Sequence, residues 1–356
     1  MLLNGFFRTF NNIIDIIEEN FKNIYKNSSF YEKKISKTLE IDFNYKPSPH
    51  LLSSLINYQN KKYKIDELDL NIIWENDSKS REFKKLNNFF WFFSLDLKSS
   101  KKSAQIVISD WIHKNGNYKK KSWEFDITAK RIISWLSNHH LTYNESNDEY
   151  KSIFNHMIQK QTNHLINEIK NSKSLEDKII GCSAIILVGL SYKIEKNYLN
   201  FGLNFLKKII KHSIDNQGFS RSRNIRQQIF YLKYFILIRE WFKESLFEVP
   251  EHIDETIYYL GQAYSYFWQN TQVNLLFNGN NNSNNQDFDN YLKRLGYKFK
   301  NENKDYCGYT ILQNKKICLV MDTGSSPELK YSKDYQSGAL SFEIISNSKK
   351  IKSNSG

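Results

Sequence analysis

The stretch WEFDITAKRIISWL, residues 123–136, spaces its apolar side chains as a helix that buries one face. Comparable blocks, separated by short polar breaks, recur on both sides of it. Eight consecutive helices predict paired hairpins, and curved stacking of the hairpins into an α/α toroid lets each helix bury one stripe. The predicted helices span residues 82–97, 101–114, 126–141, 147–171, 176–192, 196–214, 224–244 and 250–270.

Beyond Trp268 the sequence takes on the character of strands. The segments at residues 273–277, 309–312, 316–322 and 339–345 are short and rich in β-branched or alternating residues. We therefore predict a mainly α chain with a β segment, namely an incomplete α/α toroid followed by the first strands of an antiparallel β-sandwich. Too few strands precede Gly356 for an independent sandwich, so we expect a truncated product.

The N-terminal part is predicted to be an extension of the toroid. Apolar residues in 10–21 fit one helix face, and residues 65–74 can form short strands. The predicted domains are accordingly the extension at residues 1–80, the toroid at 81–271 and the incomplete β-sandwich at 272–356.

The charge of the chain indicates an anionic partner. A formal net charge of +13 and a pI near 9.3 attract nucleic acid, anionic lipid headgroups and acidic polysaccharides. The lysines are scattered, which is typical of a generally solvated basic surface. No recognisable DNA- or RNA-binding motif accompanies the charge, so nucleic acid is not a predicted partner. No run approaches the roughly 20 apolar residues of a membrane span.

The cysteines predict neither a disulfide framework nor a zinc site. Cys182, Cys307 and Cys318 are odd in number and lack CxxC spacing, so we expect buried thiols. No metal or cofactor is predicted.

Several segments, in chain order, resemble the heparinase II/III family as it occurs in bacteria. The resemblance covers most of the chain from about residue 80, and it places the last strands within the C-terminal β domain of the family. The segments are LNNFFWFF (86–93), DWI (110–112), WEFDITAKRIISWL (123–136), DNQGFSRSR (215–223), LFNG (276–279), CGY (307–309), LVMDTG (319–324), SGALSFE (337–343) and NSG (354–356).

The resemblance implies a lyase that cleaves acidic polysaccharides by β-elimination. This reaction requires that the uronate carboxylate be neutralised, the C5 proton be removed and the leaving glycosidic oxygen be protonated. In the family an Asn or His meets the carboxylate, and Tyr and His transfer protons.

Those family positions are altered in this chain. The family Tyr falls near Ile225, with Tyr231 as the nearest phenol, and Gln336 stands in place of the His. The segment expected to hold an Asn-His pair, residues 177–183, reads DKIIGCS. Whether catalysis survives these changes is left open by the sequence.

Three residues are predicted to be catalytic. Arg221 would neutralise the uronate, because a guanidinium fork suits a carboxylate. Tyr231 would be the base, activated by nearby cations since the ordinary phenol pKa is about 10. His139, which ends a helix beside Asn138, could complete an Asn-His pair, although a histidine there also caps the helix dipole.

Five residues are predicted to bind substrate. Trp123 would stack on a sugar ring, with a core position as the alternative. Arg131 would face the interior of the toroid, with pairing to Asp126 or Glu124 as the alternative. Arg223 would bind substrate as well, with a structural salt bridge as the alternative. The remaining two residues are Asn138 and Gln336.

Three other polar sites are interpreted as ordinary surface features. Asn163-His164 copies the family dipeptide about one helix too early and is predicted to be an exposed polar pair. Asp322 and Glu343 are predicted to be turn and edge-strand charges.

The leading hypothesis is a lyase that receives an acidic glycan in a basic cleft between the toroid and the β domain. The alternative is a non-catalytic glycan-binding or envelope-assembly protein on the same scaffold. The resemblance implies the cell envelope or periplasm, whereas residues 1–24 lack the pattern of a signal peptide, so the cytoplasm is the alternative. The sequence specifies neither the glycan nor the oligomeric state.

Overall fold

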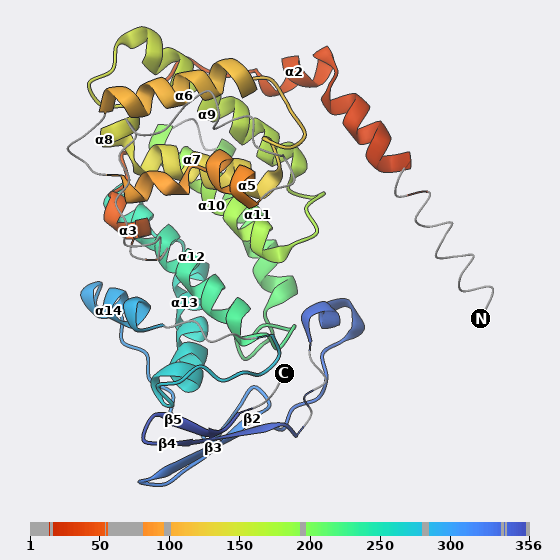
Figure 1. Cartoon of the computed structure of the whole chain (residues 1–356), viewed down its shortest axis with the longest axis vertical. Coiled ribbons are helices and arrows are strands. Elements are labelled where there is room, and N and C mark those ends of the chain that lie inside the picture. The colour runs from red at the N-terminus through yellow and green to blue at the C-terminus, as the bar shows by residue number, and fades with distance from the viewer. Residues whose placement is uncertain are drawn as a thin grey trace. The chain divides into compact units, whose positions relative to one another are not determined.

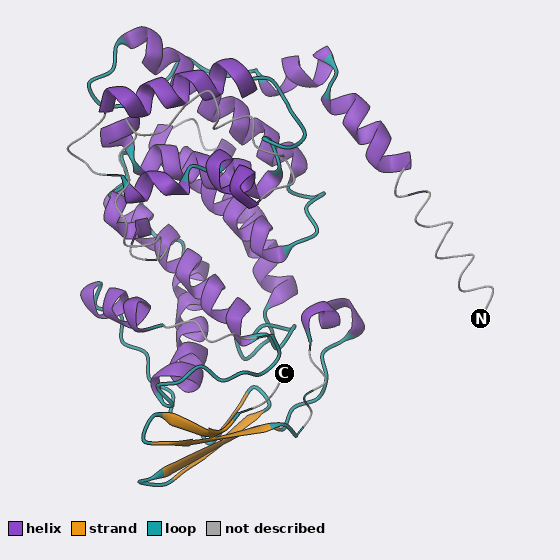
Figure 2. Cartoon of the chain, viewed as in Figure 1, coloured by secondary structure: helices purple, strands orange, loops and turns teal. Residues whose placement is uncertain are grey.

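The computed structural model of the chain describes residues 14, 17–53, 55, 81–95, 101–192, 197–279, 285–335, 338 and 340–353. Helices make up most of this part of the chain, and Figure 2 shows the strands confined to its C-terminal part. The chain divides into two compact units. The first comprises Met1–Lys46, Tyr58–Ser172 and Ser191–Ile194, and the second comprises Pro47–Asn57, Lys173–Leu190 and Glu195–Gly356.

The first unit is built from helices that pack in pairs (Figure 1). Helix α7 packs against α9, α5 and η2, while α6 packs against α8 and α2 against α9. The elements are α2 (Ser29–Ile35), α5 (Arg81–Asn87), η2 (Phe90–Ser94), α6 (Lys101–Asn115), α7 (Phe125–Ser137), α8 (His139–Thr142) and α9 (Asp148–Glu168).

Aromatic side chains fill the core of the first unit. The ring of Trp135 meets those of Phe89 and Trp111 edge-on, with centroids 5.2 and 5.6 Å away. Phe89 has a left-handed backbone, with φ of 59°, which ends the helical path after α5 before η2 begins. The helix predicted at residues 82–97 is therefore two short helices.

The second unit begins with helices and ends with a sheet. Its helices α12 and α13 follow each other closely and form a packed hairpin. The helical elements are α3 (Pro49–Ser53), α10 (Leu175–Tyr192, whose last two residues belong to the first unit), α11 (Asn197–Ser213), α12 (Ile225–Glu244), α13 (Glu251–Tyr264), the π-helical turn η3 (Ser265–Gln269), α14 (Gln286–Arg294) and η4 (Leu329–Asp334).

The sheet is an antiparallel meander in the order β1-β2-β3-β4-β5. Its register places Ile311 opposite Val320 and Val320 opposite Glu343. The Tyr266 hydroxyl of η3 donates to the carbonyl oxygens of Lys304 and Tyr309, which fixes the end of the helical hairpin to the sheet. The strands are β1 (Asp305–Tyr306), β2 (Tyr309–Gln313), β3 (Ile317–Asp322), β4 (Phe342–Ser346) and β5 (Lys349–Lys352).

The predicted fold class, a mainly helical α/α toroid that leads into an antiparallel β segment, is confirmed. The strand predicted at residues 273–277 is wrong, because the Leu276 N–H donates to the Glu343 carboxylate instead of a neighbouring strand. Helix α14 was not predicted.

The domain limits stay predictions, and residues 65–74 lie outside the described residues. Within the described part, no helix combines the length and the apolar character that a membrane crossing requires.

Candidate functional site

Arg131, a predicted substrate-binding residue, lies in the core of the first unit. Its side chain is fully buried, and it donates to the Gln161 side chain (2.7 Å) and to the carbonyl oxygens of Asn87 and Ser122 (2.9 Å each). Its guanidinium lies 3.9 Å from the Trp111 ring centroid, and burial lowers the pKa of Arg131 well below its ordinary value. These contacts leave no face of the side chain open to a glycan.

The alternative pairing of Arg131 is also wrong. Asp126 pairs with Lys130 at 2.9 Å, and Glu124 pairs with Lys84 at 2.7 Å. Among the described residues no carboxylate is in ion-pair contact with Arg131, so neutral oxygens and an aromatic face stabilise this cation.

Trp123 is a core residue of the first unit. It is 1% exposed, and its indole N–H donates to the carbonyl oxygen of Asn115 at 2.7 Å. The ring of His164 meets it edge-on, with centroids 5.3 Å apart. The Trp123 ring is therefore covered by protein and has no exposed face on which a sugar could stack in this structure.

His164 is buried as well, so the prediction of an exposed Asn163-His164 pair is wrong. The Tyr31 hydroxyl lies 2.7 Å from Nδ1, and the carbonyl oxygen of Trp123 lies 3.0 Å from Nε2. Burial lowers the pKa of His164 from 6.5 to about 3. The imidazole is therefore neutral at pH 7, with Nε2 donating and Nδ1 accepting.

Asn138 and His139 both have local partners within the first unit. Asn138 is buried and its amide donates to the Ser134 carbonyl oxygen at 2.9 Å, where α7 ends and α8 begins. The half-buried His139 ring meets Phe43 edge-on. Asn138 is thus the C-cap residue of α7, and the substrate-binding role of Asn138 and the catalytic role of His139 stay predictions.

The loop at residues 215–223, in the second unit, turns tightly before α12. The Asp215 carboxylate accepts from the N–H groups of Gln217 and Phe219, at 2.9 Å each. Gly218 has φ of 79°, and a Cβ there would lie 2.2 Å from that of Tyr259 on α13, so only glycine allows this approach. The Asn224 side chain then caps α12 by accepting from the N–H groups of Arg226 and Gln227.

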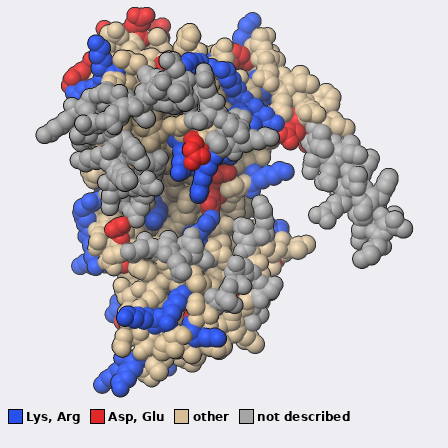
Figure 3. All heavy atoms as spheres, viewed as in Figure 1, with Lys and Arg blue, Asp and Glu red and all other residues tan. Residues whose placement is uncertain are grey.

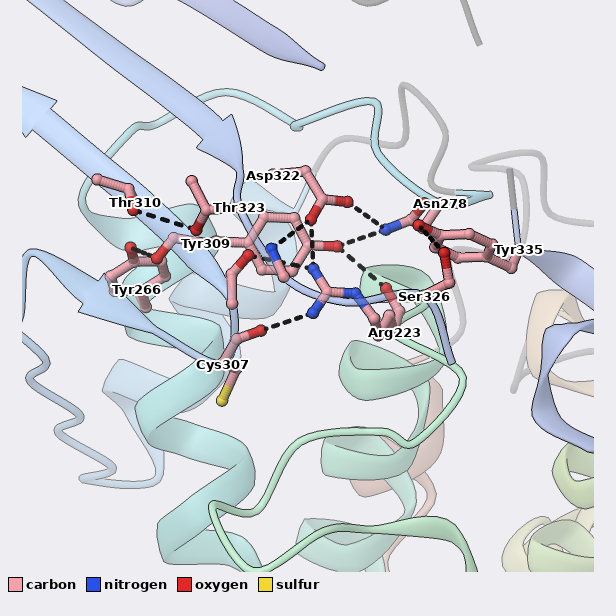
Figure 4. A network of polar contacts seen from close by, with 12 residues as sticks. Arg223, Tyr266, Asn278, Cys307, Tyr309, Thr310, Asp322, Thr323, Ser326 and Tyr335 are labelled. Carbon is pink, nitrogen blue, oxygen red and sulfur yellow. Dashed lines mark hydrogen bonds and ion pairs between the residues drawn. The ribbon is translucent and has the colours of Figure 1, made fainter. Parts of the chain in front are cut away.

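Arg223 is the buried end of this loop (Figure 4). Its guanidinium lies 2.5 Å from the carboxylate of Asp322 and donates to the carbonyl oxygens of Cys307 and Gly308, at 3.2 Å each. It also lies 4.6 Å from the Tyr309 ring centroid. The predicted alternative, a structural salt bridge, is what the structure shows for Arg223.

Asn278 and Tyr309 complete the polar network around Arg223, and Asn278 contacts the second oxygen of the Asp322 carboxylate. The Asn278 amide donates to Asp322 at 3.0 Å and to the Tyr309 hydroxyl at 2.6 Å, and that hydroxyl donates to the Arg223 carbonyl oxygen at 3.3 Å. Burial raises the pKa of Tyr309, so its phenol stays protonated. A Cβ at Gly308 or Gly324 would come within 2.4 or 2.0 Å of the guanidinium, so both glycines make room for Arg223.

Arg221 faces a different environment from Arg223. Its half-buried side chain lines a pocket of about 450 Å³ between the loop, α11 and α13. Lys207, Lys211 and His252 line the same pocket, which we call the cationic pocket. Its acidic members are Asp215 and Glu255, so the permanent cations outnumber the carboxylates. Burial and the charge of Lys207 lower the pKa of His252, which keeps its imidazole neutral at pH 7.

A second pocket, of about 520 Å³, adjoins the cationic pocket in the same unit. We call it the tyrosine pocket, because Tyr258, Tyr259 and Tyr306 line it together with amide side chains. Tyr259 lines both pockets.

Tyr231 lines neither of these pockets. Tyr231 is 1% exposed in the buried stripe of α12, and it is absent from the lining of both pockets, so its phenol cannot reach a ligand there. Gln336 lies outside the described residues.

Sequence reasoning missed Lys207, His252 and Tyr259, and it placed two acids wrongly. Asp322 and Glu343 are both fully buried, so they are not turn and edge-strand charges. Glu343 pairs with Lys350 at 3.0 Å. The alternation of β3 could have revealed the burial of Asp322. Side chains two residues apart in a strand lie on the same side, and Asp322 shares the buried side of β3 with Val320.

Basic side chains do not gather into a single field on the face drawn in Figure 3, where Lys and Arg lie at several separate places. Among the residues that the structure describes, no group of three His, Cys, Asp or Glu side chains could hold a metal ion.

Helical hairpins that lead into an antiparallel sheet, tied to it by a buried Arg–Asp pair, define a protein of the α/α-toroid class with a β domain. Residues 301–356 match the family model described as heparinase II/III-like, C-terminal. The resemblance to the heparinase II/III family that the sequence motifs predict is thus confirmed.

Solved structures show the same fold over most of the chain. A crystal structure of heparinase III is 14% identical, with a TM-score of 0.63, and the match covers 91% of this chain and 62% of that one. The heparan sulfate lyase HepC from Pedobacter heparinus is 12% identical, with a TM-score of 0.58, and the match covers 91% and 58%. The chain thus spans less than two thirds of either structure. No curated protein matches it.

Proposed function

We propose that this protein is polysaccharide lyase-like and binds an acidic, uronate-containing glycan in the cationic pocket. The observation that carries the proposal is the convergence of Arg221, Lys207 and Lys211 on one pocket. Cations held by a folded scaffold attract a carboxylate, and a half-buried guanidinium gives it two parallel N–H donors. The heparinase fold supports a glycan as the ligand.

The same pocket holds the groups that β-elimination needs. Arg221 would neutralise the uronate carboxylate, and the neutral imidazole of His252 would accept the C5 proton. The electron pair of that C–H bond would form the C4–C5 double bond as the C4–O bond breaks. The hydroxyl of Tyr259 would then give its proton to the leaving oxygen. In this proposal His252 takes the role of base that the sequence assigned to Tyr231.

A non-catalytic glycan-binding or envelope-assembly protein is the second candidate. It is favoured by Ile225 at the family position of the Tyr and by the burial of Tyr231. Either function, in which an acidic glycan is the partner, supports a place in the cell envelope or periplasm, with the cytoplasm as the alternative that fractionation would test.

Binding of the full chain to oligogalacturonate and hyaluronan oligosaccharides, measured by calorimetry, tests the proposal. We expect Arg221→Ala to weaken binding about tenfold or more, because a charged hydrogen-bonding partner is lost. The matched control is Arg226→Ala, since Arg226 is an exposed arginine of the same unit that faces Glu176 at 3.6 Å instead of the pocket. Equal binding by the Arg221 variant and the parent would refute the proposal.

Ultraviolet absorbance of the unsaturated product separates the two candidates. A lyase generates this absorbance, and His252→Gln should abolish it while binding is retained. Binding by the parent with no product at any pH would favour the non-catalytic protein.

A further inference from the structure

The tyrosine pocket has the chemistry of a sugar site without the charge of an anion site. Three segments line it, namely the loop through Gln217, helix α13 through Tyr258 and Gln262, and the approach to β1 through Asn301 and Asn303. Its volume of about 520 Å³ falls in the roughly 300–1,000 Å³ range of ligand pockets.

The aromatic wall of this pocket is presented to solvent. Tyr258 is 57% exposed, so its ring is accessible to a ligand. Its ring meets that of Tyr259 edge-on, with centroids 5.4 Å apart, so the two rings form one angled surface. An aromatic face of this kind offers apolar area to the C–H face of a sugar ring.

The polar groups of the pocket suit hydroxyls. Amide side chains both donate and accept, as sugar hydroxyls do, and Gln217, Gln262 and Asn303 line this pocket. A fourth lining amide, Asn301, is buried and already bonds to the Gln262 carbonyl oxygen and the Asn303 N–H. The Tyr306 hydroxyl fixes one edge by donating to the Gln217 carbonyl oxygen at 3.2 Å.

Charge distinguishes the tyrosine pocket from its neighbour. Of the described residues that line it, none is Lys, Arg or His, and Asp305 is the one carboxylate among them. A second anion placed there would therefore meet repulsion and no compensating cation. The cationic pocket has the opposite preference, and Tyr259 is the wall common to both.

We infer that the tyrosine pocket is a second subsite, which binds an uncharged sugar ring next to the acidic ring held in the cationic pocket. The inference rests on the proposed function for the acidic ring only. A chain in which acidic and uncharged sugars alternate would fill both pockets, whereas a chain of uronates alone would fill one.

Calorimetry on the full chain tests this subsite with two acidic probes, a hyaluronan hexasaccharide and a galacturonate hexasaccharide. We expect Tyr258→Ala to weaken the hyaluronan probe about tenfold and to leave the galacturonate probe within about twofold. Asn303→Ala should show the same selectivity. Phe247→Ala is the control, because Phe247 is an exposed aromatic side chain of the same unit that lines neither pocket.

Two results would overturn the subsite, namely unchanged hyaluronan binding by Tyr258→Ala and an equal loss for both probes. A chitotriose probe, which carries no charge, separates this inference from the proposed function. If the parent bound neither acidic probe, the proposed function would fall. The subsite would then stand if chitotriose bound and Tyr258→Ala abolished that binding, and it would fall if chitotriose did not bind.

Discussion

The two units each bury an arginine against an aromatic ring, but they stabilise the charge differently. In the first unit, Arg131 lies over Trp111 and donates to neutral oxygens. In the second unit, Arg223 lies over Tyr309 and pairs with the buried Asp322. Removal of Arg131 leaves behind neutral partners, whereas removal of Asp322 leaves the Arg223 cation buried without its counterion. The comparison predicts different responses to mutation.

The largest effect is expected when the ion pair loses its acid. Asp322→Ala should lower the free energy of unfolding by about 3–5 kcal/mol, because it leaves the Arg223 cation buried without a counterion. Urea unfolding of the full chain measures this. Asp254→Ala is the control, since Asp254 pairs with Arg239 but is about half exposed, and the expected cost there is below about 1 kcal/mol. Similar costs for both variants would contradict the ion-pair account.

A smaller effect is expected from the unpaired arginine. Arg131→Met should cost about 2–4 kcal/mol, because it leaves two carbonyl oxygens and the Gln161 side chain without donors but leaves no charge. Lys130→Met on the same helix should cost less than about 1 kcal/mol by the same urea measurement, since Lys130 makes a partly exposed pair. A cost for Arg131→Met above that of Asp322→Ala would reverse the comparison.

The glycines beside Arg223 provide a sharper test of its placement. Gly308→Ala should be about 1–3 kcal/mol more destabilising than Gly296→Ala in thermal or urea unfolding. Both glycines have positive φ, 75° and 79°, so backbone strain is shared. Only the Cβ at position 308 would meet Arg223, because the space around Gly296 is open within 4 Å. Equal costs would show that the guanidinium does not occupy this place.

The last test concerns the acid sensitivity of the first unit, where the expected change is small for each pH unit, at most about 1.4 kcal/mol. His164 has a pKa of about 3 when folded and 6.5 as the ordinary value, so the unfolded chain takes up the proton first. Its contribution to stability is therefore complete above pH 6.5 and is lost as the pH falls toward 3, by at most about 1.4 kcal/mol per pH unit. Denaturation between pH 7 and 4 should show a flatter slope for His164→Gln, whereas the exposed His113→Gln should keep the parent slope. Identical slopes would exclude a neutral buried imidazole.

The helices were predictable because each buries one face, and the apolar residues of that face recur in the sequence at helical spacing. Helix α14 was missed because its stretch is mostly polar, and only Phe288, Tyr291 and Leu292 mark its buried side. The strand expected at residues 273–277 failed because a buried side chain, Glu343, takes the backbone N–H that a neighbouring strand would need.

The site was only partly predictable. Arg221 was found from its loop, but its partners in the cationic pocket come from α11 and α13, and no local pattern joins these segments. Arg223 and Asp322 are 99 residues apart, so no local pattern in the sequence shows that they pair. Without a visible partner, Asp322 is expected at the surface, where isolated acids usually lie. Tyr231 was chosen as the nearest phenol along the chain, a criterion that ignores which side of α12 is buried.

The pairing of Arg223 with Asp322 also has a consequence for how this protein could change over time. Because Arg221 stands two residues before Arg223, whose guanidinium is held by Asp322 and by the carbonyl oxygens of Cys307 and Gly308, we expect these anchors to influence where the Arg221 side chain lies. A substitution of Asp322, which lines neither pocket, could therefore change how tightly an acidic ligand is held in the cationic pocket.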